Sequence, residues 1–230
     1  MCCGPRAGLV ETLADAKSID HVKGAMHDLD VGPGLDAYFD HVYGRYDDAS
    51  ASDGEAGDAP GRREASLNFA RSLAGASLLC YALDVKDRHN GNILIDRAGR
   101  LTHIDFGYML GRTPGGLSFE DAPFKLPAEY VAALGGVGSD AWAAFAAALA
   151  AGAHAIAAEL AALQTLLVLF FGDSPVGVDA ARRLGDRFAG LDGDPRRTVA
   201  FATDLIARSF DSDRGKQYDW YQWKTNGIRI

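Results

Sequence analysis

The chain has 230 residues, 48% of them hydrophobic and 23% charged, so it can build a sizeable core and is not a disordered protein. Its formal net charge of −8 argues against a general nucleic-acid-binding protein, because a duplex-binding face needs clustered lysine and arginine. The negative total excludes little at a membrane, where a local basic or aromatic patch can act. The length suits one large domain or two small ones.

The three cysteines and the N-terminal sequence indicate the kind of cellular compartment. Cys2 and Cys3 are adjacent and Cys80 lies in an apolar run, which gives neither a disulfide framework nor a metal-binding pattern. The first residues lack the apolar segment of a secretory signal peptide. We therefore expect Cys80 to be a small buried hydrophobic residue in a reducing compartment, as in a cytoplasmic protein.

The first 83 residues predict one strand and two helices around an acidic insertion. Residues 8–19 indicate a short strand followed by a turn. Apolar residues at helical spacing predict a helix over 35–46 and a longer one over 62–83. Residues 47–61 are acidic and of low complexity, which is typical of a disordered insertion in a surface loop, and no chemistry is assigned to them.

A β-hairpin is predicted in the middle of the chain, from apolar runs at 93–95 and 101–104 with a turn between them. A hairpin brings its two ends together, so Asn92 before the first strand and Asp105 after the second can face one small volume. An amide and a carboxylate offered together suit a hard cation that carries phosphate oxygens.

Beyond the hairpin, glycine and proline mark 107–125 as a loop, and helices follow. The apolar stretch 141–172 is dominated by alanine and includes His154 and Glu159, so we assign it to soluble helices rather than to a membrane span. The chain is therefore predicted to have an α+β fold, mostly helical with a small β element. The helices are expected at 127–134, 140–151, 153–171, 179–188 and 195–210, with Pro127 and Pro195 in first turns and with Ser139 or Asp140, and Asp194, as N-caps.

The spacing of polar residues around the hairpin indicates which kind of reaction the site suits. Asp87 precedes Asn92 by five residues, as in the kinase catalytic loop H-R-D-x-x-x-x-N, and Asp105 opens a D-F-G triplet thirteen residues after Asn92. The triplet at 87–89 reads Asp-Arg-His, however, and not His-Arg-Asp.

This inverted order resembles the phosphatidylinositol 3-/4-kinase superfamily, whose catalytic loop reads D-R-H-x-x-N. The strings V-K-D-R-H-N-G-N-I-L-I-D and H-I-D-F-G-Y-M-L are similar to the type III phosphatidylinositol 4-kinases, and most of all to their beta branch. The resemblance implies that residues 8–230 form the large lobe of a protein-kinase-like (lipid kinase) fold. It also implies ATP-dependent phosphorylation of phosphatidylinositol at the 4-position of the inositol ring, for phosphoinositide signalling.

Asn92 and Asp105 are the candidate metal ligands, and they would hold Mg²⁺, or Mn²⁺ in its place, on the phosphates of ATP. Both residue types are also common turn formers at hairpin ends, but the spacing favours the functional interpretation. His89 is the candidate base for the attacking hydroxyl, because its ordinary pKa of about 6.5 lies near working pH. Asp87 is either that base or the group that supports His89, and the resemblance favours the second role.

Three further residues of this region carry less specific predictions. Arg88 is counted with the catalytic residues and is expected to pair with a carboxylate of the lobe and hold the loop. Lys86 either reaches a substrate phosphate in the ATP site or is a solvated loop residue. His103 is expected to be structural.

The loop over 107–124 is where the resembled family selects its lipid headgroup. Enzymes that act on phosphorylated inositides would need several arginines or lysines there. Phe106 and Gly107 open the segment, its only cation is Arg112, and Lys125 follows just beyond its end. The segment therefore favours plain phosphatidylinositol as the substrate.

The C-terminal segment suits a membrane interface, a docked final helix, or both. Tyr218, Trp220, Tyr221 and Trp223 lie between lysines and an arginine, a pattern typical of membrane interfaces. By resemblance we expect a cytoplasmic protein held peripherally on intracellular, Golgi-like membranes that contain phosphatidylinositol. No nucleic acid is expected as a partner, and the sequence identifies no regulatory protein.

Half of an ATP site is missing from the predicted elements. No Gly-rich phosphate loop and no strand lysine precede residues 8–19, and the Gly-Pro-Gly at 32–34 is no substitute. The chain is therefore expected to be a fragment, or a non-catalytic form that binds a partner or lipid. A serine/threonine kinase with the same D-R-H loop is another alternative, as is a metal-dependent phosphohydrolase, which would need more histidine ligands.

Overall fold

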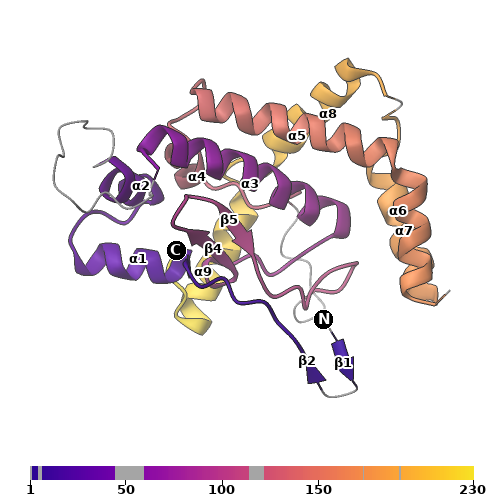
Figure 1. Cartoon of the computed structure of the whole chain (residues 1–230), viewed down its shortest axis with the longest axis horizontal. Coiled ribbons are helices and arrows are strands. Elements are labelled where there is room, and N and C mark those ends of the chain that lie inside the picture. Colours follow the sequence, from indigo (N-terminus) through magenta and orange to yellow (C-terminus); the bar gives the residue numbers. More distant parts are fainter. Residues whose placement is uncertain (1, 5–6, 45–59, 114–121, 173, 192) are drawn as a thin grey trace.

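The computed structural model of the chain describes residues 2–4, 7–44, 60–113, 122–172, 174–191 and 193–230 (Figure 1). The disordered insertion predicted over 47–61 lies, apart from residues 60 and 61, outside the described residues. Residues 114–121 of the predicted loop also lie outside them.

Helices dominate the structure, and a small antiparallel sheet lies among them, so the prediction of a mostly helical α+β fold is confirmed (Figure 1). In chain order the elements are β1 (Cys2–Gly4), β2 (Ala7–Gly8), β3 (Ala16–Ser18), α1 (Ile19–Asp28), α2 (Leu35–Tyr43), α3 (Arg62–Leu83), the 3-10 turn η2 (Asn90–Asn92), β4 (Ile93–Asp96), β5 (Leu101–His103), α4 (Ala128–Ala133), α5 (Asp140–Ala158), α6 (Leu160–Phe170), α7 (Pro175–Arg187), α8 (Pro195–Ser209) and α9 (Asp213–Asn226).

The predicted hairpin is confirmed as β4 and β5, and β3 pairs antiparallel with the other edge of β4. Asp96 closes its turn, because the carboxylate Oδ1 accepts hydrogen bonds from the N–H groups of Ala98 and Arg100, both at 2.9 Å. Gly99 has a φ of +80°, and a Cβ there would lie 2.9 Å from the carbonyl oxygen of Ala65 on α3. The turn therefore approaches α3 this closely only because residue 99 is glycine.

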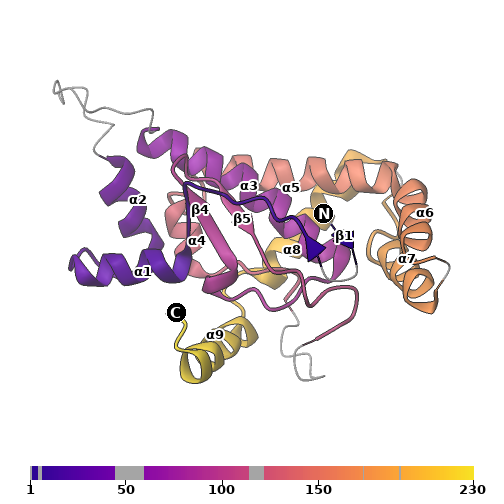
Figure 2. The same cartoon turned by 60° about the horizontal axis from the view of Figure 1, so that its bottom comes forward.

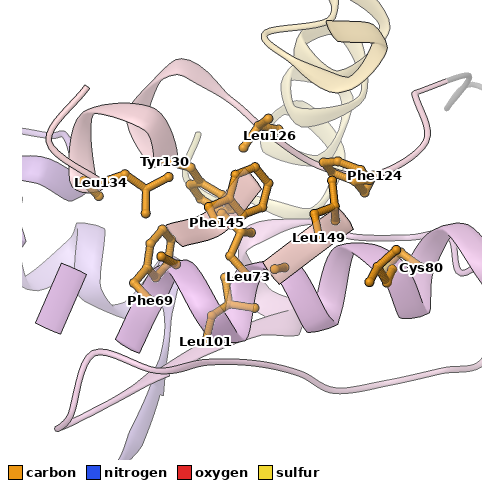
Figure 3. Packing of buried hydrophobic residues seen from close by; sticks show 14 of the residues in the cluster. Phe69, Leu73, Cys80, Leu101, Phe124, Leu126, Tyr130, Leu134, Phe145 and Leu149 are labelled. Carbon is orange, nitrogen blue, oxygen red and sulfur yellow. The ribbon is translucent and has the colours of Figure 1, made fainter. Parts of the chain in front are cut away.

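The central helix α3 has the bounds that the sequence predicted, and it contacts β5, α2, α5 and α7. Its Phe69 ring lies 5.5 Å from the Tyr130 ring of α4 (Figure 3). The same ring lies 5.4 Å from the Phe39 ring of α2. Full burial of each such ring contributes about 1.5–3 kcal/mol. Ser72 Oγ of the same helix accepts a hydrogen bond from Leu101 N–H at 2.9 Å, which fixes the hairpin against α3.

The prediction for residues 8–19 is wrong in the order of its elements. The turn at 14–15 precedes the strand β3, and the chain then enters α1, which the sequence analysis missed. Ser18 caps this helix by accepting a hydrogen bond from the N–H three residues later, at 3.1 Å. Ile19, Val22 and Met26 are buried at helical spacing, but Lys23 is buried beside them and interrupts the apolar pattern.

The helix break predicted at residue 152 is also wrong. α5 continues through Gly152, and the next helix starts only at Leu160. A Cβ on Gly152 would lie 2.3 Å from Leu78 Cδ1 of α3, so this glycine permits a close crossing of two helices. α5 is long and apolar enough to cross a membrane by length and composition alone, but its Phe145 and Leu149 are fully buried in the core of the lobe (Figure 3).

The remaining helices agree with the sequence apart from details at their ends. α2 starts at Leu35 as predicted and ends at Tyr43, before the predicted residue 46. α8 begins at Pro195 with Asp194 as its N-cap, as predicted. Pro127 is the N-cap residue of α4 rather than part of its first turn. α7 starts four residues before the predicted 179, because Ser174 caps it and Pro175 occupies its first turn.

The C-terminal helix is docked on the lobe, and the end of the chain lies beside α1 (Figures 1 and 2). Lys23 Nζ donates a hydrogen bond to Ile230 O at 2.9 Å. The N–H of Arg229 donates to Asp20 Oδ1 at 2.7 Å. The docked-helix interpretation of the C-terminal segment is therefore confirmed.

Candidate active site

The predicted catalytic loop, residues 84–92, leaves α3 through two left-handed backbone positions. Asp84 has a φ of 51° and ends the helix, and Asp87 has a φ of 67°. Between them, the N–H of Lys86 donates to Tyr108 O at 2.8 Å. This bond pairs the start of the loop with the segment that follows D-F-G, so the two halves of the site form one unit.

Arg88 is a buried residue of the catalytic loop, and its side chain binds main-chain carbonyls. Its Nε donates to Lys86 O at 3.0 Å, its Nη1 to Ile104 O at 2.7 Å, and its Nη2 to Asp105 O. The guanidinium also lies 5.5 Å from the centre of the Phe106 ring. Among the described residues its hydrogen-bond partners are all carbonyls, so the expected carboxylate partner is wrong. The rigid fork of donors instead holds the loop and the D-F-G segment together.

Asp87 and Asn92 contact each other directly. Asn92 Nδ2 lies 3.1 Å from Asp87 O and 3.5 Å from Asp87 Oδ2, which turns the amide oxygen of Asn92 away from the carboxylate. The N–H of Ile104 donates to Asn92 O at 3.0 Å, and Asp105 is the next residue. The hairpin therefore brings Asn92 and Asp105 to the same end, as its prediction requires.

The side chains of Asn92 and Asp105 can supply two oxygen ligands to a hard cation. Asp105 is exposed, has a φ of 55°, and its Oδ1 accepts a hydrogen bond from Gly107 N–H at 3.2 Å. No group of three or more His, Cys, Asp or Glu that could hold a metal ion occurs within the described part of the chain. One amide and one carboxylate suit Mg²⁺, which usually keeps water and phosphate oxygens as its other ligands.

His89 precedes η2, and its side chain is only 14% exposed. Its Nδ1 accepts a hydrogen bond from Gly91 N–H at 3.1 Å, so the neutral ring carries its proton on Nε2, which lies 3.9 Å from Asp87 Oδ1. Burial is the main cause of a lowered His89 pKa. Asp87 opposes that shift, and the charges of Lys125 and Arg88 add to it. The ring is therefore neutral at pH 7.

The other predicted site residues lie in different surroundings. Lys86 Nζ is 3.4 Å from Asp84 Oδ1 and its side chain is 14% exposed, so its interpretation as a solvated loop residue is wrong. Lys125 Nζ lies 2.6 Å from Asp219 Oδ1, so this lysine faces α9 rather than open solvent. Arg112 is exposed at the described beginning of the predicted substrate loop, residues 107–124.

His103 lies on β5 behind the site. Its Nδ1 is 3.3 Å from the Sγ atom of Cys80, which is buried as predicted. Burial, helped by the charges of Arg88 and Lys125, lowers the pKa of His103 to about 3. The neutral ring packed against a thiol agrees with the predicted structural role.

Two buried residues of α9 complete the site and were missed by the sequence analysis. The Tyr218 hydroxyl donates to Asp87 Oδ1, and Gln222 Nε2 lies 3.4 Å from the same oxygen and 2.6 Å from Tyr218 Oη. Their spacing of four places both on one helix face. Nothing in the sequence tells where that face docks, so this spacing alone could not have identified them.

A comparison with known families identifies the chain. The sequence profile described as "Phosphatidylinositol 3- and 4-kinase" matches residues 32–170, which include the catalytic loop and the hairpin. The chain belongs to the phosphatidylinositol 3- and 4-kinase family. The resemblance drawn from the D-R-H triplet is thereby confirmed.

Relatives within this phosphatidylinositol kinase family agree with that assignment. The chain is 43% identical over 145 residues to "Phosphatidylinositol 4-kinase PIK1a" of Candida albicans, an alignment that covers 59% of the chain and 14% of that protein. It is 36% identical over 229 residues to "Phosphatidylinositol 4-kinase beta 1" of Arabidopsis thaliana, covering 96% of the chain and 19% of that protein. The chain therefore spans less than a fifth of the length of these relatives.

A solved structure has a fold similar to that of this chain. The open conformation of CtTel1 superposes with a TM-score of 0.54 and 22% sequence identity, covering 66% of this chain and 6% of that one. At this identity the similarity concerns the fold alone. It agrees with the expectation of a helical lobe of a kinase-like fold.

Proposed function

We propose that the chain supplies the large lobe of a 1-phosphatidylinositol 4-kinase, which transfers phosphate from ATP to the 4-hydroxyl of phosphatidylinositol. The observation that carries this proposal is the joint position of Asp87, His89 and Asn92 at one end of a hairpin whose second strand leads into Asp105. The names of the relatives, all phosphatidylinositol 4-kinases, support the choice of reaction.

Asn92 and Asp105 would hold Mg²⁺, or Mn²⁺ in its place. When bound, the ion neutralises the charge that develops on the phosphates of ATP. Asp87 keeps the Asn92 amide oriented by accepting its Nδ2–H groups, and the N–H of Gly107 keeps the Asp105 carboxylate in place. Both ligands are therefore fixed by the chain itself before substrate arrives.

His89 would accept the proton of the inositol hydroxyl, because the ring is neutral at pH 7. To accept it at Nε2 the ring needs the other tautomer, in which Nδ1 carries the proton and no longer accepts from Gly91. Asp87, 3.9 Å from Nε2, would then face the new positive charge. Both oxygens of Asp87 already accept hydrogen bonds from α9 and Asn92, which favours this supporting role over that of the base.

The substrate loop supports phosphatidylinositol without further phosphates on its ring. Arg112 is the only cation of residues 107–124, whereas each extra phosphate would require arginine or lysine partners. The nearby Lys125 is already paired with Asp219 of α9. A headgroup that carries no further phosphate on its inositol ring therefore fits this segment best.

Peripheral contact with a membrane is part of the proposal. Trp220, Tyr221 and Trp223 are 55%, 53% and 48% exposed on the helix that also carries Tyr218 and Gln222 into the site. Amphipathic aromatic side chains favour the membrane–water interface. A cytoplasmic protein on Golgi-like membranes, with no nucleic acid as partner, is the setting that the family resemblance favours.

The test is a transfer assay with the full-length protein, radiolabelled ATP and three acceptors. These are vesicles of phosphatidylinositol, vesicles of phosphatidylinositol 4-phosphate, and a serine-containing protein. We expect label on phosphatidylinositol at the 4-position and little on the other two. Label on protein serine would identify a protein kinase, and vesicle binding without any transfer would identify a non-catalytic module.

A further inference from the structure

We infer that Tyr218 and Gln222 of α9 are positioning residues, which hold the oxygen of Asp87 that faces His89. The inference rests on the proposed function, because it concerns proton transfer at the same site. It also makes a claim about the catalytic loop that is measurable without any reaction.

A directed chain of hydrogen bonds runs along one face of α9. Asn226 Nδ2 donates to Gln222 Oε1 at 2.6 Å, Gln222 Nε2 donates to Tyr218 Oη at 2.6 Å, and the Tyr218 hydroxyl donates to Asp87 Oδ1. Residues 218, 222 and 226 are spaced by four and lie above one another on the helix. Hydrogen bonds arranged head to tail polarise one another, and this chain ends on the carboxylate.

The residues of α9 contact one particular oxygen of Asp87. Tyr218 and Gln222 both approach Oδ1 of Asp87, and Oδ1 is also the atom that lies 3.9 Å from His89 Nε2. The other oxygen, Oδ2, faces Asn92. The helix therefore binds the carboxylate oxygen that faces His89, the proposed proton acceptor. The other oxygen binds Asn92, the proposed metal ligand.

α9 buries polar side chains and exposes large aromatic ones. Tyr218 and Gln222 are 7% and 6% exposed, whereas Trp220 and Trp223 are about half exposed. A helix that only filled space would bury its tryptophans and leave glutamine in water. Burying the polar pair requires hydrogen-bond partners, and Asp87 supplies them.

α9 has other anchors, so the loss of one hydroxyl should not release it. Lys125 Nζ lies 2.6 Å from Asp219 Oδ1, with both side chains mostly buried. Asn90 Nδ2 donates to Arg229 O at 2.8 Å, which ties the tail beyond the helix to the catalytic loop. A variant of Tyr218 therefore tests positioning rather than docking.

The experiment compares Tyr218→Phe with Tyr38→Phe in the full-length protein. Each variant loses one tyrosine hydroxyl, but Tyr38 lies on α2, where its ring packs against those of Phe39 and Tyr43, and it serves as the matched control. Tyr218→Phe should lower kcat about 10- to 100-fold and leave KM for ATP and for phosphatidylinositol within about twofold, because misplacing a catalytic group slows the chemical step. Tyr38→Phe should match the wild type in kcat.

A second readout needs no activity. Hydrogen exchange of the amides at 87–92 should be faster in Tyr218→Phe than in the wild type and unchanged in Tyr38→Phe. Unchanged exchange, an unchanged kcat, or KM values that rise in step with a fall in kcat would overturn the inference. If the wild type transfers no phosphate to phosphatidylinositol but the exchange difference appears, the proposed function fails and the positioning role stands.

Discussion

Three of the six described non-glycine residues with a positive φ lie where the chemistry is proposed. Asp87 and Asp105 have φ values of 67° and 55°, and Asp84 just before the catalytic loop has 51°. Aspartate tolerates this left-handed conformation better than most residues, but each instance still costs about 1–3 kcal/mol. The surrounding bonds offset that cost, above all the three carbonyl contacts of Arg88.

Tyr130 provides a stability test at a single atom. It is fully buried, and its hydroxyl has no hydrogen-bond partner among the described residues. Tyr130→Phe should therefore raise the free energy of unfolding by about 1 kcal/mol at pH 7, because an unsatisfied buried hydroxyl is removed. Urea unfolding followed by circular dichroism measures the change.

Tyr43 is the matched control for Tyr130, because it is equally buried but donates to Asp96 O at 3.2 Å. Tyr43→Phe should lower the free energy of unfolding by about 1 kcal/mol. If both variants change stability in the same direction, the contrast between a bonded and an unbonded hydroxyl is refuted.

The pH dependence of Tyr130→Phe follows from burial, which raises the pKa of Tyr130 well above its ordinary value. The unfolded chain loses this proton above about pH 10, whereas the folded chain keeps it. Ionisation of Tyr130 in the unfolded chain therefore leaves the free energy of unfolding of the wild type unchanged below about pH 10. Above that pH it lowers this free energy by about 1.4 kcal/mol per pH unit. The advantage of Tyr130→Phe over the wild type should grow between pH 10 and 11, and a constant difference would contradict the assignment.

At the scale of elements, we expect alanine substitutions at two glycines within helices to change stability in opposite directions. A Cβ on Gly152 of α5 meets Leu78 at 2.3 Å, whereas a Cβ on Gly75 of α3 meets no atom within 4 Å. Gly152→Ala should lower the free energy of unfolding by about 1–3 kcal/mol, because Leu78 must move within a packed core. Gly75→Ala should raise it by about 0.5–1 kcal/mol, because alanine is the better helix former.

Denaturant unfolding of the two glycine variants side by side is the measurement, and each is the control for the other. A stabilising Gly152→Ala would mean that α5 and α3 do not cross as closely as the structure has them. A destabilising Gly75→Ala would mean that some group covers that face of α3.

Elements fixed by local signals were predictable from the sequence, and those fixed by tertiary contacts were not. The periodicity over Arg62–Leu83 and the turn residues Asp96 to Arg100 predicted α3 and the hairpin correctly. Gly152 was misread because the sequence shows the helix-breaking tendency of glycine but not the leucine against it. α1 was missed because its buried Lys23 breaks the apolar pattern and is paired with Glu129 only in the folded lobe.

The candidate site divides in the same way. The proximity of Asn92 and Asp105 could be predicted from the sequence, because a hairpin brings its own two ends together. Tyr218 and Gln222 could not, because they reach Asp87 from a helix far along the chain. Arg88 was assigned the wrong partner, since a sequence shows carboxylates that are available but not the carbonyls that a loop presents.

At the scale of the whole molecule, one end of the lobe gathers the hairpin base, the catalytic loop and α9. α6 and α7 lie at a distance from this end (Figures 1 and 2). Bonds from residues 218–230 reach both the catalytic loop and α1. The helix proposed to meet the membrane is therefore the helix that contacts the proposed proton-transfer residues.

Membrane contact through α9 is tested by Trp220→Ser. Trp220 is 55% exposed, and removing a side chain of this size from an interface should weaken binding to phosphatidylinositol vesicles about tenfold in a co-sedimentation assay. Phe170→Ser on α6, where the ring is 83% exposed, should leave binding unchanged. Equal effects of the two variants would show that exposed aromatics in general, rather than α9, bind the vesicles.

The most direct test of the central claim is the rate of phosphate transfer to phosphatidylinositol by full-length Asp105→Ala. We expect at least a 100-fold fall in kcat (on the order of 3 kcal/mol), because a ligand of the charge-neutralising ion is lost. Asp204→Ala is the control, since Asp204 forms an exposed pair with Arg208 on α8, and it should keep transfer within about twofold of the wild type. Transfer by Asp105→Ala at the wild-type rate would contradict the assignment of the hairpin base as the phosphoryl-transfer site.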